Sequence, residues 1–422
     1  MAHSHSHAHS HRDGPSQVEV ARGPVTILLG FLAIAAIATV VAVVALWPDA
    51  GVVDKLREQA QYAAPGATFP KAEVSSVSTA CPDSGAGSSA GSGAAADPTT
   101  TPSCGSVGVV LKDGPEKGET KTVGIPTAVA ESGLGAGDTV RLLRVPGTDG
   151  AAASYSFDDV VRLQALWILW IAFIVVVAAV ARLRGILALV SLGFGGYVLL
   201  KFMLPALLSG SSGMAVSLAG SAAIMFVVLY LAHGPSIRTS AALAGTLLGV
   251  GVTALIGQLA INGADLSGFA DEGSALLSAF AGSLSFQGLF TCALVVAGLG
   301  VLNDVTITQA SAVWELREAG PELGRRELFS RAMRIGRDHI ASTIYTIVFA
   351  YAGSALAILL LLSLYDRPIW DLLSSEAIAE EVVRTLASGI GLVLAVPITT
   401  LIAAATVVGP KAPSVPQTAG PG

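Results

Sequence analysis

Charged residues are scarce in this sequence. They make up 13% of its 422 residues, whereas 52% are hydrophobic, and a soluble globular domain usually carries about 25% charged residues. The missing charge is replaced by Ala, Leu, Val and Ile and by 47 glycines, and glycine is common where transmembrane helices pack closely. The composition therefore argues against a soluble globular protein and predicts a chain whose main partner is the lipid bilayer.

The residue patterns of familiar chemistry are also missing. The three cysteines form no CxxC or Cys/His zinc spacing, there is no HExxH motif, and no Ser/His/Asp or Cys/His arrangement is apparent. His233 and His339 each stand alone near an expected helix end. With a net charge of −6 and no basic stripe with interleaved aromatics, the chain lacks the features of nucleic-acid binding. We therefore expect no enzyme of a familiar type, no cofactor and no nucleic-acid partner.

Long apolar runs are the main feature of the sequence. A transmembrane helix needs about 20 apolar residues, because the hydrocarbon core is about 30 Å thick and a helix rises 1.5 Å per residue. The runs predict an all-α polytopic membrane helical bundle of about eight transmembrane helices. The expected spans are Val25–Trp47, Leu163–Val180, Gly185–Leu208, Met214–Ala232, Ala241–Ile261, Leu289–Val313, Ile340–Leu364 and Leu386–Val408.

Basic residues set the expected orientation, because loops on the cytoplasmic side carry an excess of Lys and Arg. If the N-terminus is cytoplasmic, the short inner loops are rich in arginine, whereas the short outer loop Asn262–Gln287 contains no Lys or Arg and the outer loop Asp366–Glu381 contains only Arg367. The basic residues of the inner loops are Arg182, Arg184, Arg238 and the arginines from Arg317 to Arg337. We therefore expect both termini in the cytoplasm and residues 48–162 outside it.

The expected domains follow from these spans. Residues 1–24 form a His-rich cytoplasmic tail, 25–47 a transmembrane anchor that is too long for a signal-peptide core, 48–162 an extracytoplasmic domain, 163–408 a seven-helix membrane core and 409–422 a disordered cytoplasmic tail.

The extracytoplasmic domain contains short runs typical of strands, separated by Gly-rich turns. They predict a small β-barrel of OB or SH3 type. The expected strands are Ala72–Ser78, Gly105–Lys112, Gly118–Ile125 and Thr139–Val145. The Ser/Gly/Ala-rich loop 84–102 lies between Cys81 and Cys104, and we expect a disulfide between these cysteines because disulfides persist outside the cytoplasm.

Three segments carry a family resemblance. They read Gly-Leu-Gly-Val-Leu-Asn-Asp from Gly298 to Asp304, Gly-Arg-Asp-His from Gly336, and Ser-Gly-Ile-Gly-Leu-Val-Leu-Ala-Val-Pro from Ser388. Together they resemble the YibE/YibF-like family of bacterial integral membrane proteins, and the extracytoplasmic domain resembles that of the YibE-type members. The resemblance implies a protein of the bacterial cytoplasmic membrane that acts as a permease, and it implies no substrate.

Asp304 is the first candidate functional residue. It follows a long apolar run, and a carboxylate at the centre of a bilayer costs about 2.5–3.5 kcal/mol on insertion scales. Asn303 precedes it, and Thr308 and Ser311 lie on the same helical stripe. These residues are expected to line a path for an ion or proton. The alternative is that the span ends near Asn303 and Asp304 caps a cytoplasmic helix.

Arg337 and Asp338 are the second candidate pair, at the start of the seventh expected span. In one interpretation they pair with groups on the preceding span, and Thr343 and Thr346 continue a polar face inward. In the other, Asp338 is simply favoured at a helix N-terminus, where a carboxylate gains about 0.3–1 kcal/mol.

The N-terminal tail has a histidine at every second position, namely His3, His5, His7, His9 and His11. Imidazole is a ligand for zinc, nickel, copper and cobalt, so the tail is expected to bind divalent metal loosely. An idle low-complexity tail or an added tag remains the alternative.

Three functions stay open at this point. The first is a permease for an unknown small solute or ion with an intramembrane Asp as its ion or proton group. The second is a divalent-metal export or homeostasis factor, suggested by the histidine tail. The third is a non-transporting membrane sensor or scaffold, whose outer domain binds a ligand while the Arg-rich loop responds inside.

Overall fold

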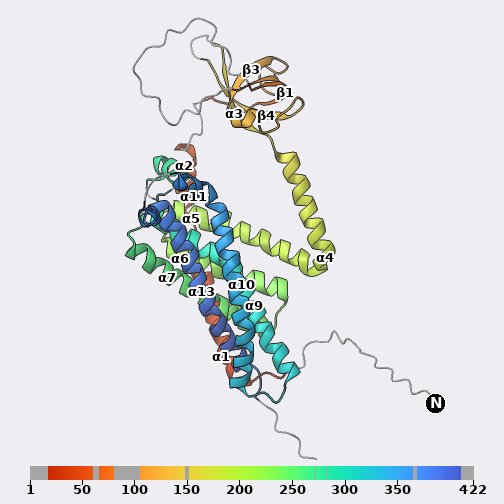
Figure 1. The fold of residues 1–422 in the computed structure, drawn as a ribbon, viewed down its shortest axis with the longest axis vertical. Helices are drawn as coiled ribbons and strands as arrows, with labels where there is room; N and C mark the ends of the chain where they lie inside the picture. The colour runs from red at the N-terminus through yellow and green to blue at the C-terminus, as the bar shows by residue number, and fades with distance from the viewer. Residues whose placement is uncertain are drawn as a thin grey trace, which may run out of the picture. The chain divides into compact units, whose positions relative to one another are not determined.

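The computed structural model describes residues 18–59, 66–79, 105–147, 152–270, 272–282, 284–364 and 368–409. The histidines of the N-terminal tail, Cys81, Cys104, the loop 84–102 and the residues after Gly409 lie outside the described residues. The chain divides into two compact units, one of Glu58–Val177 and one of Met1–Arg57 with Ala178–Gly422. Figure 1 shows the sheet of the first unit and the helical bundle of the second.

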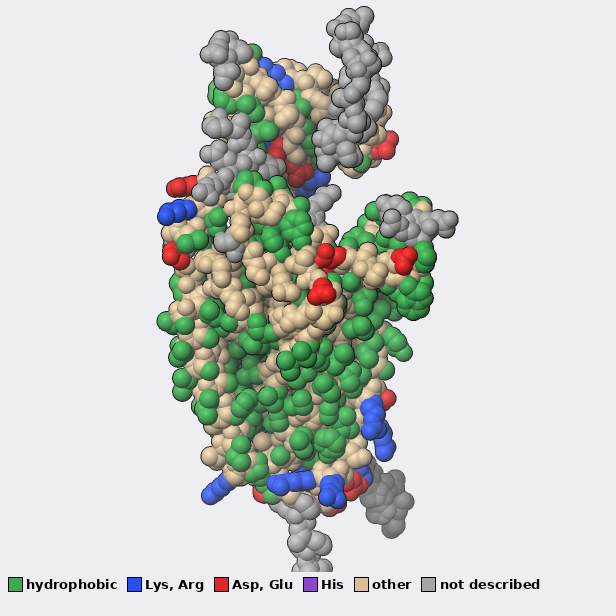
Figure 2. All heavy atoms as spheres, turned by 90° about the vertical axis from the view of Figure 1, so that its left-hand side faces the viewer, with side chains coloured by type: hydrophobic (Ala, Val, Ile, Leu, Met, Phe, Trp, Pro, Cys, Tyr) green, Lys and Arg blue, Asp and Glu red, His purple; other side chains and the backbone are tan. Residues whose placement is uncertain are grey.

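Helices make up the larger unit. They are α1 (Arg22–Ala45), α2 (Ala50–Gln59), α4 (Leu163–Val198), the π-helical η1 (Leu199–Met203), α5 (Leu204–Leu208), α6 (Gly213–His233), α7 (Ile237–Gly263), α8 (Glu272–Phe280), α9 (Phe286–Ala319), α10 (Arg325–Ser354), α11 (Leu356–Ser363), α12 (Ile369–Leu373) and α13 (Glu376–Thr406), with α4 beginning in the smaller unit. Hydrophobic side chains cover a broad band of this bundle on the face drawn in Figure 2, and Lys and Arg side chains gather at one end of it.

Within the described residues, six helical segments are long and apolar enough to cross a membrane, and a seventh is counted if α10 and α11, bent by 66°, form one span. The expected number of eight is therefore not confirmed. Two of the expected spans fall in the single segment Leu163–Leu208, whose helix is interrupted at Arg182 by a backbone with φ 53° and ψ −137°. The break lies in the charged stretch that separates the two apolar runs.

Two helices also extend beyond the expected spans. Helix α9 continues to Ala319 and α10 already begins at Arg325. A run of apolar residues marks only the part of a helix that suits the lipid hydrocarbon. The helix itself continues as long as one of its faces packs against the rest of the bundle. In α10 that face begins with Leu328, Ala332 and Gly336, all buried.

The closest helix packing joins α7 to α13 through small residues spaced four apart. A Cβ atom at Gly245 would lie 2.0 Å from the Thr399 hydroxyl, and one at Gly391 would lie 1.8 Å from the Thr253 hydroxyl. Between these two contacts, a Cβ at Gly249 would lie 3.0 Å from the Ala395 side chain. Without a hydrophobic force between helices in lipid, close approach at small residues supplies the packing energy. This seam fixes the register of α7 against α13.

The smaller unit contains a five-stranded antiparallel sheet. Its strands are β1 (Lys71–Ser78), β2 (Gly105–Leu111), β3 (Thr120–Ile125), β4 (Thr139–Val145) and β5 (Ser154–Val160), and a short helix α3 (Thr127–Ala130) follows β3. Their order in the sheet is β3-β2-β1-β4-β5. In β2 every second residue is buried, the alternation of a sheet with one face on a core. The first four strands agree with the expected ones within two residues, whereas β5 was not predicted.

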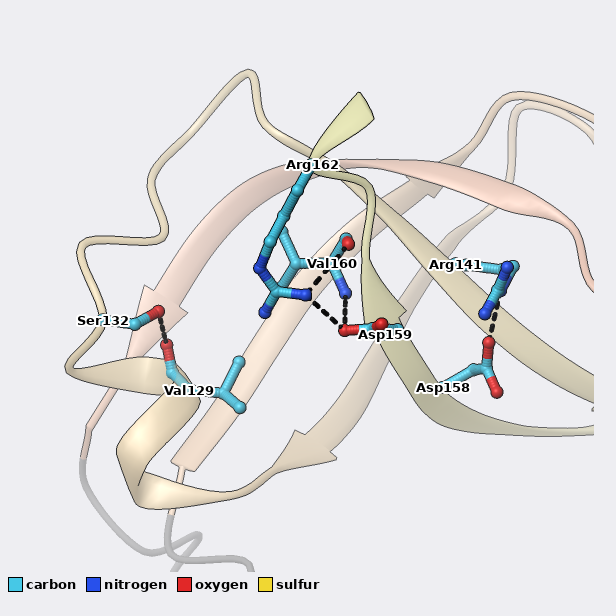
Figure 3. Close-up of polar contacts among 7 residues, drawn as sticks. All are labelled: Val129, Ser132, Arg141, Asp158, Asp159, Val160 and Arg162. Atoms are coloured by element: carbon cyan, nitrogen blue, oxygen red, sulfur yellow. Dashed lines mark hydrogen bonds and ion pairs between the residues drawn. The ribbon is translucent and has the colours of Figure 1, made fainter. Parts of the chain in front are cut away.

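The sheet is nearly closed, because β3 and β5 at its two edges approach each other. The ammonium of Lys121 on β3 lies 5.4 Å from the centre of the Tyr155 ring on β5. Ion pairs add to β5, where Arg141 binds Asp158 and Arg162 binds Asp159 at 2.8 Å (Figure 3). A small curved sheet is therefore confirmed, and its assignment as an OB or SH3 barrel is not.

The core of this sheet predicts a first mutational result. Leu142 is fully buried, whereas the next residue, Leu143, is partly exposed. Removing a buried leucine side chain costs about 2–5 kcal/mol, which is a large part of the stability of a small domain. We expect Leu142→Ala in the full chain to make the domain that contains this sheet readily cleaved by trypsin at neutral pH. Leu143→Ala should stay nearly as resistant as the wild type, and equal cleavage of both variants would contradict this account of the core.

Acid should weaken the same domain through Glu116. Its pKa lies below the usual value of 4.5, chiefly because Lys121 donates a hydrogen bond to its carboxylate. A carboxylate whose pKa is lower in the folded than in the unfolded protein stabilises the fold at pH values above its unfolded-state pKa. This stabilisation is lost as the pH falls through the folded-state pKa. The Glu116 side chain is 24% exposed, so solvent screens this ion pair and the effect is small. Between about pH 5 and about pH 3, we expect the urea resistance of Glu116→Gln to decline less than that of the wild type. The fraction of folded domain is measured by pulsed hydrogen exchange at one fixed pH after incubation in urea. If the urea resistance of both proteins declined equally with pH, the stabilising role of Glu116 would be refuted.

Candidate functional site

Asp304 lies in the middle of α9 and faces α10. Its Oδ2 atom is 3.7 Å from Nε2 of His339, and the two side chains are 69% and 30% exposed. The Nε2 atom of His339 is itself shielded and has no hydrogen-bond partner among the described residues. The sequence singled out Asp304 but treated His339 as isolated, and the structure brings the two together.

Several helices show where this pair lies along the bundle. No charged residue occurs in α7 between Arg238 and Asp265, in α13 from Arg384 to its end at Thr406, or in α1 after Arg22. These stretches lie side by side, since α7 packs on α13 and the residue before α1 donates a hydrogen bond to the carbonyl of Thr406. These stretches share one range of depths in the bundle, which we call the charge-free layer after α1, α7 and α13. It is the part of the bundle suited to the hydrocarbon of a bilayer.

The Asp304–His339 pair lies near the middle of the charge-free layer. Leu302, two residues before Asp304, lies beside Gly249 of α7, and Gly249 lies beside Ala395 of α13. Ala395 is midway between Arg384 and the end of α13. At a rise of 1.5 Å per residue, Asp304 is about 15 Å from the end of α13. Because α9 runs on to Ala319, Asp304 does not cap a helix. An ionised carboxylate at the centre of a bilayer costs about 2.5–3.5 kcal/mol on insertion scales.

The other candidates on α9 do not form an interior path with Asp304. Asn303 is half-buried, and its Oδ1 atom has no hydrogen-bond partner among the described residues. Thr308 is exposed like Asp304, and its hydroxyl donates to the backbone carbonyl of Asp304. Ser311 is half-buried. Asp304 and Thr308 therefore share an outward-facing stripe of the chain, not a channel through it.

The candidates on α10 divide in the same way. Arg337 and Asp338 are exposed. Thr343 is buried and donates to the carbonyl of His339 at 2.8 Å, whereas the exposed Thr346 donates to the carbonyl of Ser342 at 3.3 Å. Asp338 is not at the N-terminus of a helix, because α10 begins at Arg325. The interpretation of Asp338 as a helix cap is therefore wrong, and both charged residues are exposed.

The interior of the bundle has its own polar contacts, which the sequence did not single out. The side-chain amide of Gln309 on α9 donates to the carbonyl of Ala332 on α10 at 2.9 Å and to the hydroxyl of Thr400 on α13 at 2.7 Å. The hydroxyls of Thr246 and Thr306 are 2.6 Å apart. These contacts tie α7, α9, α10 and α13 together. In the sequence, the only sign of these contacts was the side-chain amide of Gln309 within an expected span. Because an amide carries no formal charge, it was not singled out.

A metal site is not evident in the part of the chain that the structure describes, where no group of three His, Cys, Asp or Glu side chains could hold an ion. The only described cysteine, Cys292, is buried and free. The histidine tail and the pair Cys81–Cys104 lie outside the described residues, so metal binding by the tail and the disulfide stay predictions.

A family model described as YibE/F-like protein matches residues 169–409, which is more than half of the chain. This chain belongs to the YibE/F-like family. The matched region runs from α4 to the end of α13 and contains both Asp304 and His339, whereas α1 and the five-stranded sheet lie before it. No curated protein and no solved structure matches the chain. Membership of the YibE/F-like family and the apolar helices together indicate a membrane protein.

Proposed function

We propose that this YibE/F-like protein is a permease that moves a small solute or ion across the bacterial cytoplasmic membrane. The observation that carries the proposal is a titratable pair, Asp304 and His339, halfway through the charge-free layer. Ionisable residues at such depth are rare, and they commonly serve ion pathways and proton relays in transporters.

The pair has the chemistry for a proton or cation step. An ionised carboxylate can accept a proton or bind a cation, and an imidazole ring can accept and release a proton. The side chain of Asp304 is 69% exposed, while Nε2 of His339 is shielded. A proton on either group can reach the other through a small shift of the side chains, because only 3.7 Å separates Oδ2 from Nε2.

The proposed orientation has both termini in the cytoplasm. It is supported by the arginines at one end of the bundle, where Arg325 of α10 donates to the carbonyl of Val407 and the residue before Arg22 is hydrogen-bonded to α13. Loops rich in Arg stay on the cytoplasmic side. Residues 48–162 then follow the opposite end of α1 and lie outside the cytoplasm.

Flux through the purified full chain tests this function. The protein is reconstituted into liposomes that contain a pH-sensitive dye, and proton movement is followed after a pH jump with Na⁺, K⁺, Mg²⁺, Zn²⁺ or a metabolite mixture outside. We expect a rate above that of protein-free liposomes with at least one of these solutes. The absence of flux with every solute would reject the permease proposal.

A membrane sensor is the second proposal, supported by one feature of the outer domain. A polar cavity of about 330 Å³ there is lined by Lys71, Lys112, Asp113, Asp138 and Gln164 among others. A pocket with both charge signs suits a small zwitterionic or polar ligand. Ligand binding to the full chain in the absence of any flux would favour this proposal over transport. The metal-export hypothesis depends on the histidine tail alone, and metal tolerance after deletion of residues 1–12 would test it.

A further inference from the structure

Ser388 on α13 and Thr253 on α7 carry buried hydroxyl groups that have no hydrogen-bond partner among the described residues. The two residues are only 3% and 0% exposed. Other buried threonines of the bundle, such as Thr246 and Thr400, donate to the backbone carbonyl four residues before them. Buried polar groups are nearly always paired, and an ordered water molecule serves where the chain offers no partner. The two hydroxyls therefore indicate a ligand in the interior of the bundle.

Gly298 on α9 leaves an open space beside these two residues. A Cβ atom at Gly298 would lie 3.6 Å from the hydroxyl oxygen of Ser388 and 3.7 Å from the methyl carbon of Thr253. Both are ordinary van der Waals distances, so a methyl group would fit there without strain. At Gly391, by contrast, a Cβ atom would lie 1.8 Å from the Thr253 hydroxyl. The space beside Gly298 is thus large enough for a water molecule, and the Ser388 hydroxyl borders it.

Polar side chains lead from one end of the bundle to this space. Arg384, where the charge-free layer begins on α13, lies one helical turn before Ser388 on the same side of the helix. Its guanidinium binds Glu381 at 2.9 Å, and the two side chains are 28% and 20% exposed. Nε of Arg384 and Oε1 of Glu381 are shielded and have no hydrogen-bond partner within the described part of the chain. Tyr351 on α10 lies near Arg384, Glu381 and Ser388. Solvent that reaches the ion pair is therefore one helical turn from the space beside Gly298.

Leu302 closes the space on its other side. It follows Gly298 by one helical turn and is 1% exposed. Its side chain packs against Gly249 of α7, where a Cβ atom would lie 3.0 Å from it. A solute that entered past Arg384 would have to displace Leu302 to continue through the bundle.

We propose that the space beside Gly298 binds a water molecule through the Ser388 hydroxyl, at the deep end of a hydrated entrance that begins at Glu381 and Arg384. Water suits the site because it is neutral and both donates and accepts hydrogen bonds, as a hydroxyl does. A bare Mg²⁺ or Ca²⁺ ion needs six or more oxygen ligands, and the side chains around Gly298 do not supply them. The entrance gives the permease an interior route, and in that role it rests on the proposed function.

Silver ions test whether solvent reaches this site, because Ag⁺ is small enough to follow water and reacts with thiols. The full chain, with its three cysteines replaced by Ala, carries one new thiol and is treated in open membrane fragments in chloride-free buffer. Unreacted thiols are then counted with a fluorescent maleimide after denaturation. Ser388→Cys is compared with Ala387→Cys, because Ala387 is the preceding residue and is 2% exposed. We expect the thiol at position 388 to react about tenfold or more faster, since the thiol at position 387 reacts only when the bundle opens locally.

Filling the space provides a second measurement. Gly298→Ala adds a methyl group that meets its neighbours at ordinary distances, so the bundle should keep its fold. In this background we expect the thiol at position 388 to react with Ag⁺ about tenfold more slowly, because the methyl group takes the place of the water molecule. Gly300→Ala is the matched control on the same helix, since a Cβ atom there would meet nothing within 4 Å. It should leave the rate unchanged.

Equal rates at positions 388 and 387 would overturn the site. A rate unaffected by Gly298→Ala, or slowed equally by Gly300→Ala, would overturn it as well. If the chain with Ser388→Cys is not abundant in membranes, Thr253→Cys and Ala254→Cys make the same comparison from α7. Flux is measured separately in liposomes. Fast reaction in a chain that transports nothing would keep the hydrated entrance and reject the permease, whereas flux without fast reaction would keep the permease and reject the site.

Discussion

Replacing Asp304 with Asn should reduce the flux through reconstituted protein to that of protein-free liposomes. The amide has nearly the shape of the carboxylate, so the packing of α9 against α10 is retained, but it can neither take up a proton nor attract a cation. Removing the charge of Asp304 also lowers the free-energy cost of inserting α9 into the bilayer. Membrane abundance should therefore be equal to or above that of the wild type, and a loss of flux will report on the ionisable group itself.

Glu315→Gln is the matched control for this experiment. It makes the same chemical change on the same helix, at an exposed position three turns nearer the end of α9. Its flux should equal that of the wild type. Normal flux in Asp304→Asn would remove Asp304 from the mechanism, even if transport by the chain were real. Loss of flux in both variants would show that α9 tolerates no such change, and it would also count against a special role for Asp304.

The apolar helices were predictable because one physical property, the length of hydrocarbon to be crossed, sets their length. Helices α1, α6 and α7 agree closely with the expected spans. Helix α10 is different, since half of it is rich in arginine and its long extension depends on burying Leu328 and Ala332 against the rest of the bundle. That contact is tertiary. Strand β5 was missed for a similar reason, because it carries two aspartates: Asp158 is paired with Arg141 of the neighbouring strand β4, and Asp159 with Arg162 just after β5.

The candidate site was only partly predictable. An ionisable residue in an apolar run is visible in a sequence, and Asp304 was found in this way. Its neighbour His339 is far along the chain, and only the packing of α9 on α10 brings the two within 3.7 Å. The exposure of Asp304 was also unexpected, because helical periodicity gives the relative direction of side chains and not which side the rest of the bundle covers. Thr308 and Asp304 share a stripe as predicted, but that stripe faces outward.

Gly391→Ala should destabilise the whole helical bundle. The added Cβ atom would lie 1.8 Å from the hydroxyl oxygen of Thr253 and 3.0 Å from its Cβ atom, so α7 and α13 must move apart. Overpacking of this kind costs about 1–3 kcal/mol and at times more. The seam between α7 and α13 includes similar contacts at Gly245 and Gly249, so separation at one point loosens the others. We expect a lower thermal midpoint for the solubilised protein, by about 2–4 °C for each kcal/mol, measured by size-exclusion chromatography after heating.

Gly389→Ala provides the comparison that isolates packing from helix propensity. It lies on the same helix two residues away, and a Cβ atom there would meet nothing within 4 Å. Alanine is the better helix former by about 1 kcal/mol, so this variant should melt at or above the wild-type temperature. If both substitutions shift the midpoint in the same direction and by the same amount, the seam does not hold α7 and α13 together. The position of Asp304 in the middle of the charge-free layer would then be in question as well, because its depth was inferred from the contacts of Gly249 with Leu302 and Ala395.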